Sequence, residues 1–295
     1  MSTALRTLLT GLVDYAGLFP PAELPLAQAV ENYASYRRGP HAWMLGRFVL
    51  PVSLLTEFAA VSKGIVPAGG DPWWLAGLIN AASLRADINA AAEFNERHDI
   101  GAVVDTFELK GADPELVAEA AKILPRGAAL YVEVPLAADP APLLDAIAQH
   151  NVRAKARTGG VTAESIPSSA DVVRFLNGCA ERGIVYKCTA GLHHPIRARY
   201  RLTYAPDAPS GLMHGYVNVF LAGAYLLHGM PEAEAVALLD ETELKNIQFA
   251  DQGVTWRGHR LHAEQLGAAR IYATSFGSCS FEEPVGDLQQ AGVLK

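Results

Sequence analysis

Two stretches, VRAKARTGG at residues 152–160 and IVYKCTAG at residues 184–191, decide the fold of this chain. Each reads as a short β-strand that carries basic residues and ends in glycine. Between them, residues 169–182 have the spacing of an amphipathic helix that opens with a serine. A strand, a helix and a second strand in this order predict a parallel βαβ unit.

The same alternation continues on the N-terminal side of this unit. The predicted strands are residues 11–15, 47–52, 73–79, 101–108, 128–134, 152–158 and 184–190, and the predicted helices are residues 24–37, 54–62, 83–97, 114–124, 141–150 and 169–182. Repeated eight times, this spacing nearly fills the 295 residues. No GxGxxG motif follows the first strand, which disfavours an open dinucleotide-binding sheet. The sequence therefore predicts an α/β protein of the closed (β/α)8 type, the TIM barrel.

The segment after the seventh strand departs from the regular pattern. Residues 196–210 predict a long loop, and helices are expected at residues 212–228 and 232–240. Two positions compete for the eighth strand, residues 246–251 and residues 270–276, and residues 249–261 also read as a small hairpin that turns near 251–253. We expect one domain over residues 1–295, with residues 196–262 as an insertion or elaboration after strand seven.

Composition restricts the partners and the compartment. The net charge of −7 argues against a nucleic-acid partner, which needs a clustered basic surface. Three cysteines form neither a disulfide framework nor a CxxC metal spacing, and residues 1–10 lack a secretory pattern, so a reducing, cytoplasmic location is expected. His214, Asn218 and internal glycines interrupt the apolar run at 212–228, which predicts a buried helix rather than a membrane span. This helix is also a candidate interface for a homo-oligomer.

Polar side chains recur at the ends of the predicted strands. In a barrel the carboxyl ends of the strands meet at one mouth, so residues there are the functional candidates. Burying charges is costly unless they are paired or used, which makes their repetition informative. The candidates are Asp14, Asp105, Glu108, Glu133, Lys155, Arg157, Lys187, His193 and His194.

The sixth strand points to an anion. Its alternation places Arg153, Lys155 and Arg157 on the face toward the barrel interior or mouth, and glycines follow whose bare backbone can approach a ligand closely. Loops after the seventh and eighth strands often bind phosphate in barrels. We therefore expect a small anionic metabolite as partner, bound by Arg157, Gly159, Gly160, Gly191, His193, Arg197, Gly277 and Ser278.

The two strand-end lysines suggest amine chemistry. Like-charge repulsion and desolvation would lower the pKa of Lys155 and Lys187 and leave a neutral amine that can attack a carbonyl group. The predicted catalytic residues are Lys155, Lys187, Asp105 and Glu133, with no cofactor.

The stretches KARTGG at 155–160 and YKCTAG at 186–191 resemble the paired-lysine strands of class I aldolases of the deoxyribose-phosphate aldolase type. The resemblance implies that Lys155 forms a Schiff base, that Lys187 lowers its pKa and that Asp105 shuttles protons. It implies a carbon–carbon lyase that acts on a small anionic carbonyl compound. The rest of the chain resembles a bacterial barrel family of unassigned function.

Other readings of the same residues stay open. Glu108, Glu133 and His193 could hold a divalent metal ion for a metal-dependent lyase or isomerase, with a lysine as base. Lys155 could instead form a salt bridge inside the barrel to Glu108 or Glu133. A mouth whose lysines are all neutralised by carboxylates would favour a non-catalytic, ligand-binding barrel. The tract DYAGLFPPAELP at 14–25 could cover the mouth or merely lead into the first helix.

Overall fold

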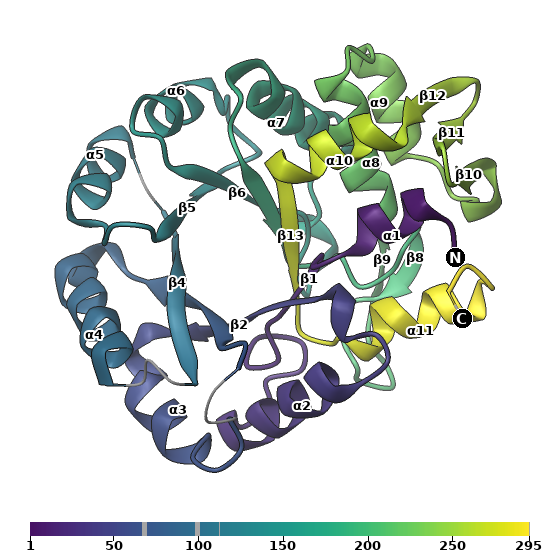
Figure 1. Ribbon diagram of the computed structural model, residues 1–295. Helices are drawn as coiled ribbons and strands as arrows, with labels where there is room; N and C mark the ends of the chain where they lie inside the picture. Colours follow the sequence, from purple (N-terminus) through teal and green to yellow (C-terminus); the bar gives the residue numbers. More distant parts are fainter. Residues whose placement is uncertain (67–69, 98–100, 112, 295) are drawn as a thin grey trace.

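Eight parallel strands close into a barrel. The computed structural model describes residues 1–66, 70–97, 101–111 and 113–294, and within them the strands follow the order β1-β13-β7-β6-β5-β4-β3-β2 (Figure 1). The predicted (β/α)8 fold is confirmed. The barrel strands are β1 (Val13–Tyr15), β2 (Leu45–Pro51), β3 (Trp73–Ile79), β4 (Ala102–Leu109), β5 (Ala129–Val134), β6 (Arg153–Arg157), β7 (Tyr186–Thr189) and β13 (Ala273–Ser278).

Helices connect these strands and cover the barrel. They are α2 (Leu26–Arg38), α3 (Leu55–Val61), α4 (Leu84–Arg97), α5 (Pro114–Ile123), α6 (Ala141–Gln149) and α7 (Ser169–Arg182), as predicted to within two residues at each end. Local chemistry sets their ends. The side chain of Asp113 accepts a hydrogen bond from Leu116 N at the start of α5, and Ser168 does the same for Asp171 N in α7. Gly183 ends α7 in the left-handed conformation that glycine adopts without strain.

The segment after β7 contains a hairpin where a loop was predicted. β8 (Ala198–Arg201) and β9 (Ser210–Met213) pair antiparallel, so the loop prediction for residues 196–210 is wrong at both of its ends. In β8, partly exposed residues alternate with exposed ones. The strand therefore lacks the alternation of apolar and polar residues by which a strand is recognised in a sequence. α8 (Tyr216–Leu227) and α9 (Glu232–Leu239) follow.

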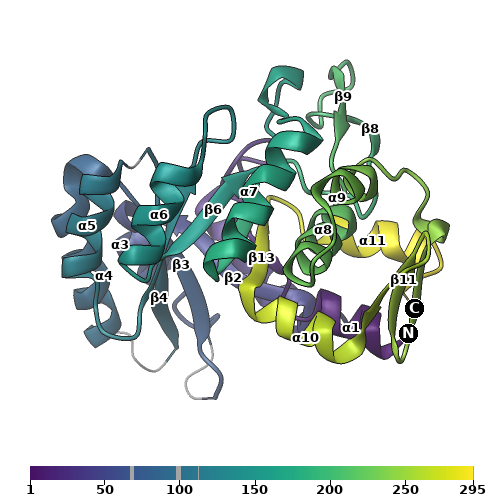
Figure 2. The same ribbon diagram turned by 90° about the horizontal axis from the view of Figure 1, so that it is seen from above.

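The eighth barrel strand is β13, which matches the 270–276 alternative. The competing segment at 246–251 lies outside the barrel, in a three-stranded sheet of β10 (Ile247–Ala250), β11 (Gly253–Trp256) and β12 (His259–His262). The predicted turn between β10 and β11 is confirmed. α10 (Ala263–Tyr272) leads from this sheet into β13, and α11 (Glu282–Gln290) follows it. Figure 2 shows the sheet and both termini on the side of the barrel away from α4 and α5.

The apolar helix α8 lies inside the protein. Its residues from Tyr216 to Leu226 are buried, and α7, α9 and α10 of the same chain pack on it. The prediction of a buried helix is confirmed, and the helix presents no apolar face to a second copy of the chain. No helix in the described ranges combines the length and the apolar character needed to cross a membrane. α1 (Thr3–Leu9) packs against α10 and β10.

Candidate active site

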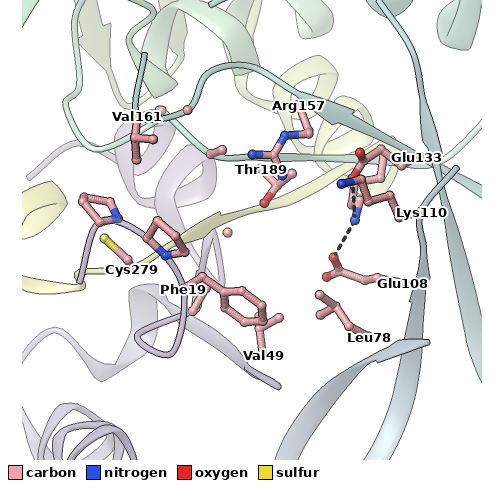
Figure 3. Close-up of a pocket in the computed structure, with 18 of the residues that line it drawn as sticks. Phe19, Val49, Leu78, Glu108, Lys110, Glu133, Arg157, Val161, Thr189 and Cys279 are labelled. Atoms are coloured by element: carbon pink, nitrogen blue, oxygen red, sulfur yellow. Dashed lines mark hydrogen bonds and ion pairs between the residues drawn. The ribbon is translucent and has the colours of Figure 1, made fainter. Parts of the chain in front are cut away.

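A cavity of about 290 Å³ opens at the carboxyl ends of the barrel strands (Figure 3). Each barrel strand, or the segment directly after it, contributes to its lining. One part of the wall is charged and the other is apolar. The charged part consists of Glu108, Lys110, Glu133, Lys155 and Arg157, and the apolar part includes Ala16, Phe19, Val49, Leu78 and Ile79. The mouth is therefore shaped for a ligand with two chemically different ends.

Parallel pairing places the charged residues of three strands at one level. Glu133 of β5 is in register with Lys155 of β6, and Lys155 is in register with Lys187 of β7. Because each of these residues points to the barrel interior, their side chains meet within it. The side chains of Asp14 in β1 and Glu108 in β4 reach the same region from other strands.

These five side chains form an interior chain of alternating charge, which we call the ion chain: Asp14, Lys187, Glu108, Lys155 and Glu133. Lys187 Nζ lies 2.5 Å from Asp14 Oδ2 and 2.6 Å from Glu108 Oε1. Lys155 Nζ lies 3.1 Å from Glu108 Oε2 and 3.0 Å from Glu133 Oε2. Every member is buried. At one end of the ion chain, Glu108, Lys155 and Glu133 line the cavity. Lys187 lies beneath them and does not.

Backbone and hydroxyl groups fix the far end of the ion chain. Asp14 Oδ1 accepts a hydrogen bond of 2.7 Å from Arg47 N, and Asp14 Oδ2 accepts one of 2.7 Å from Ser275 Oγ. Glycine stands at position 46 for a steric reason. A Cβ atom there would collide with Asp14 Oδ1, so only glycine lets β2 pass this close to the carboxylate.

The charges of the ion chain stabilise one another. Burial alone would raise the pKa of Glu108, but the two lysines outweigh it and lower the pKa to about 2. Burial alone would lower the pKa of Lys187, but the carboxylates of Asp14 and Glu108 outweigh it and raise the pKa above its ordinary value. Glu108 is thus a carboxylate and Lys187 an ammonium ion at neutral pH.

Two glycines of the predicted anion site, Gly159 and Gly191, allow two backbone segments to contact each other. A Cβ atom on Gly159 would collide with the Cα atom of Gly191, and the reverse also holds, so the segments after β6 and β7 touch at these positions. Thr158 Oγ1 donates a hydrogen bond of 2.8 Å to Ala190 O and ties the two segments together. Gly160 and Gly191 still line the cavity, whereas Gly159 does not.

Asp105 lies apart from the two lysines. Its carboxylate receives two hydrogen bonds, of 2.7 and 2.6 Å, from the guanidinium of Arg47, and both residues line a separate depression with Trp43 and Trp74. The pairing of β3 with β4 skips Asp105, because the register shifts between Leu75 and Ala76. Asp105 stands four residues before the end of β4 at Leu109, and its depression also contains Leu45 at the start of β2 and Trp74 near the start of β3. It therefore lies toward the amino ends of the strands and not at the mouth, where it was predicted.

The remaining predicted ligand residues divide between the mouth and other places. His193 and Gly277 line the cavity. Arg197 contacts Asp240 and His214 instead, away from it. Ser278 is a buried residue of β13 that pairs with β1, so its backbone belongs to the barrel sheet rather than to a phosphate-binding loop.

The predicted metal ligands do not converge. His193 Nδ1 lies 3.0 Å from Glu283 Oε2, whereas Glu108 and Glu133 are both held by Lys155. Within the described ranges, no group of three or more histidine, cysteine, aspartate or glutamate side chains is arranged to hold a metal ion. The alternative that joined Glu108, Glu133 and His193 in one metal site is therefore corrected.

Sequence reading missed part of the mouth. Asn80 and Lys110 follow directly after β3 and β4, and both line the cavity. The predicted fourth strand stopped at Glu108, one residue short of Leu109, so Lys110 was not recognised as the first residue beyond it. Of the two readings of the tract 14–25, the structure favours a cover for the mouth, because Phe19, Pro20 and Pro21 line the cavity.

Comparison with known proteins yields only distant matches. No family model matches the sequence, and no curated protein matches it. Among solved structures, the Bacillus cereus spore cortex-lytic enzyme SleL is similar at 11% identity and a TM-score of 0.42, over 96% of this chain and 74% of that chain. The catalytic domain of a hyperthermophilic chitinase from Pyrococcus furiosus is similar at 10% identity and a TM-score of 0.39, over 82% of this chain and 92% of that chain.

The predicted aldolase-type lyase is corrected. The site itself overturns the Schiff base, because each lysine contacts two carboxylates and neither is the bare amine that the mechanism requires. The alternative of a salt bridge from Lys155 to Glu108 or Glu133 is confirmed, with both partners engaged at once.

Proposed function

We propose that the mouth binds a small organic anion with an apolar end, and that the Lys155–Glu133 pair exchanges a proton with it. The observation that carries this proposal is the ion chain, whose Lys155 and Glu133 end faces a cavity with two cations that form no ion pair within the described ranges. Glu108, whose pKa the two lysines lower to about 2, lines the same cavity, and a buried ionisable group with a strongly shifted pKa in a cleft is typical of functional sites.

Arg157 and Lys110 are the anion-binding groups of this proposal. Both are exposed at the mouth, and within the described ranges neither forms an ion pair. The two cations therefore have their charges available for a ligand. A guanidinium offers paired N–H donors to a carboxylate or phosphate group, and an ammonium adds a point charge.

The apolar part of the wall selects the other end of the ligand. Figure 3 shows Phe19 and Val49 on one side of the cavity, with Glu133 and Lys110 on the other. Burying an apolar group here stabilises the complex by about 0.8 kcal/mol per methylene. A fully polar anion would leave this wall without a partner, which favours an organic acid over inorganic phosphate.

Lys155 and Glu133 supply the acid–base chemistry. A lysine ammonium has three N–H donors, and two carboxylates occupy two of those on Lys155, which leaves one for a ligand in the cavity. Glu133 removes a proton from the carbon next to the ligand's anionic group, and the electron pair of that bond stays on the ligand. The N–H of Lys155 and the charge of Arg157 stabilise the resulting anion. Return of the proton from Glu133 completes the cycle.

Deuterium exchange tests this function. Small organic acids with aliphatic or aromatic ends are incubated with the protein in deuterated water, and NMR follows the signal of the carbon-bound proton beside the acid group. We expect exchange for acids that fit the cavity, and slowing on the order of a hundredfold in Glu133→Gln. The exposed Glu115→Gln, which does not line the cavity, serves as the matched control. Absence of exchange across the panel, or equal rates in Glu133→Gln and wild type, would contradict the proposal.

A further inference from the structure

A second network of polar side chains reaches the mouth from the C-terminal part of the chain. His193, which follows β7, and Cys279, which follows β13, both line the cavity. His193 Nδ1 lies 3.0 Å from Glu283 Oε2. The hydroxyl of Tyr204, from the loop of the β8–β9 hairpin, donates a hydrogen bond of 2.9 Å to the same oxygen and lies 3.4 Å from Cys279 Sγ.

The two nitrogens of the His193 ring have different surroundings. Nδ1 is engaged with Glu283, whereas Nε2 forms no hydrogen bond to another residue of the described ranges. Because the residue lines the cavity, Nε2 is the ring atom left for a ligand. A carboxylate can only accept a hydrogen bond, so Glu283 fixes the proton of the neutral ring on Nδ1 and leaves Nε2 bare.

The state of Glu283 supports this assignment. Burial alone would raise its pKa, but interactions led by the hydrogen bond from His193 and including the hydrogen bond from Tyr204 outweigh it and lower the pKa. Burial raises the pKa of Tyr204, so its hydroxyl stays protonated and acts as the donor. Glu283 is thus an ionised acceptor that receives two donors on one oxygen.

We propose that His193 is a second proton-transfer residue of the mouth, with Nε2 as the base, Glu283 as its positioning residue and Tyr204 as the residue that holds Glu283. This inference rests on the proposed function, which supplies the bound organic acid. In a second route beside Glu133, the proton leaves the ligand carbon and bonds to Nε2, the electron pair stays on the ligand, and the imidazolium formed pairs with the Glu283 carboxylate until it returns a proton to the same carbon. Such a carboxylate both orients the ring and stabilises its charged form.

The β8–β9 hairpin, which was predicted as a loop, places Tyr204 against Glu283. β8 and β9 carry Tyr204 over the C-terminal edge of the mouth, and its side chain is 52% exposed although its hydroxyl is engaged with Glu283. An exposed aromatic ring whose hydroxyl is hydrogen-bonded to a partly buried carboxylate fits a positioning role better than a packing role.

NMR of the ring nitrogens tests the assignment without any ligand. In uniformly 15N-labelled protein, protonated and bare imidazole nitrogens resonate at well-separated frequencies. We expect wild-type His193 to show protonated Nδ1 and bare Nε2, and Glu283→Ala to shift the ring toward a mixture of tautomers. Tyr204→Phe should shift it partly in the same direction. A wild-type ring with its proton on Nε2 would overturn the assignment, even if every variant failed to fold.

Exchange rates provide the second readout. With an acid that wild type exchanges, we expect His193→Gln to slow deuterium incorporation by roughly tenfold or more. The neighbouring His194→Gln is the matched control, because His194 contacts Asp287 and stacks on Tyr200 outside the cavity lining. An unchanged exchange rate in His193→Gln would overturn the role of His193 but not the proposed function. Absence of exchange in wild type would contradict the proposed function. In that case the NMR measurement alone would decide which nitrogen of the His193 ring carries the proton.

Discussion

Lys187 Nζ lies 2.5 Å from Asp14 Oδ2, although 173 positions of sequence separate the two residues. The contact joins β7 to β1 across β13, and Glu108 of β4 binds the same ammonium group from another side of the barrel. The lysine is fully buried, so its charge is stabilised almost entirely by these two carboxylates. The contacts of Lys187 can therefore form only where β1, β4 and β7 are assembled in the barrel.

Removal of this ammonium group should destabilise the fold strongly. Lys187→Met leaves the Asp14 and Glu108 carboxylates buried beside an apolar side chain, and breaking a buried ion pair from one side costs about 3–5 kcal/mol. Urea unfolding followed by circular dichroism measures the loss. The exposed Lys63→Met is the matched control and should change the free energy of unfolding by about 0.5 kcal/mol or less. Equal free energies of unfolding in the two variants would contradict a stabilising role of the Lys187 ammonium group.

Stability should fall in acid because of Glu108. Its pKa in the folded protein is about 2, below the ordinary value of 4.5, so in this range the unfolded chain binds more protons than the folded one. The stabilisation by Glu108 is therefore present above pH 4.5 and is lost as the pH falls toward 2. Unfolding free energies measured across this window should decline less steeply in Glu108→Gln than in wild type. An identical slope in both proteins would contradict the pairing of Glu108 with the lysines.

Position 46 offers a steric test of the same cluster. The Cβ atom of Gly46→Ala would collide with Asp14 Oδ1, and forcing an extra methyl group into a packed site costs about 1–3 kcal/mol. Gly267→Ala is the control, because its Cβ atom meets nothing within 4 Å in helix α10. Alanine favours a helix over glycine by up to about 1 kcal/mol, so this control should be neutral or more stable. Thermal unfolding that ranks Gly46→Ala at or above Gly267→Ala would contradict the predicted contact.

The apolar part of the wall predicts how affinity depends on ligand size. Each methylene of a bound organic acid that reaches Phe19 should stabilise the complex by about 0.8 kcal/mol, until the cavity is full. Phe19→Ala should weaken this dependence and leave the binding of the shortest acids unchanged. Ligand-detected NMR titrations with acids of increasing length measure the effect. Equal dependence on length in both proteins would place the apolar end of the ligand elsewhere.

The sequence was sufficient to predict the barrel and the meeting of its strand-end charges. Lys155, Lys187, Glu108 and Glu133 were recognised because alternation gives the side of a strand on which each residue lies, and parallel strands end at one mouth. Their pairing was harder to predict. Whether two lysines repel one another or bind carboxylates depends on register and depth, and one sequence gives neither. The predicted loss of lysine charge was wrong because Asp14 and Glu108 reach Lys187 from other strands.

Two local features explain other errors. Asp105 lies in the first half of β4, where it binds Arg47, and the sequence did not show how far along the strand the mouth begins. The hairpin β8–β9 has strands of only four residues each. No residue of β8 is buried, and in β9 the exposed positions that alternate with buried ones include Leu212, so the sequence lacks the apolar alternation by which strands are recognised. For the same reason, the contact of Tyr204 with Glu283 could not be anticipated.

Isothermal titration calorimetry of the organic acid that exchanges deuterium, with wild type, Arg157→Gln and Arg126→Gln, tests the central claim most directly. Both arginines are exposed and outside every ion pair of the described residues, but only Arg157 lines the cavity. Loss of one charge-assisted contact costs about 1.5–3 kcal/mol, so Arg157→Gln should bind on the order of tenfold to a hundredfold more weakly, with Arg126→Gln equal to wild type. Equal affinity of all three proteins would contradict an anion held at this mouth.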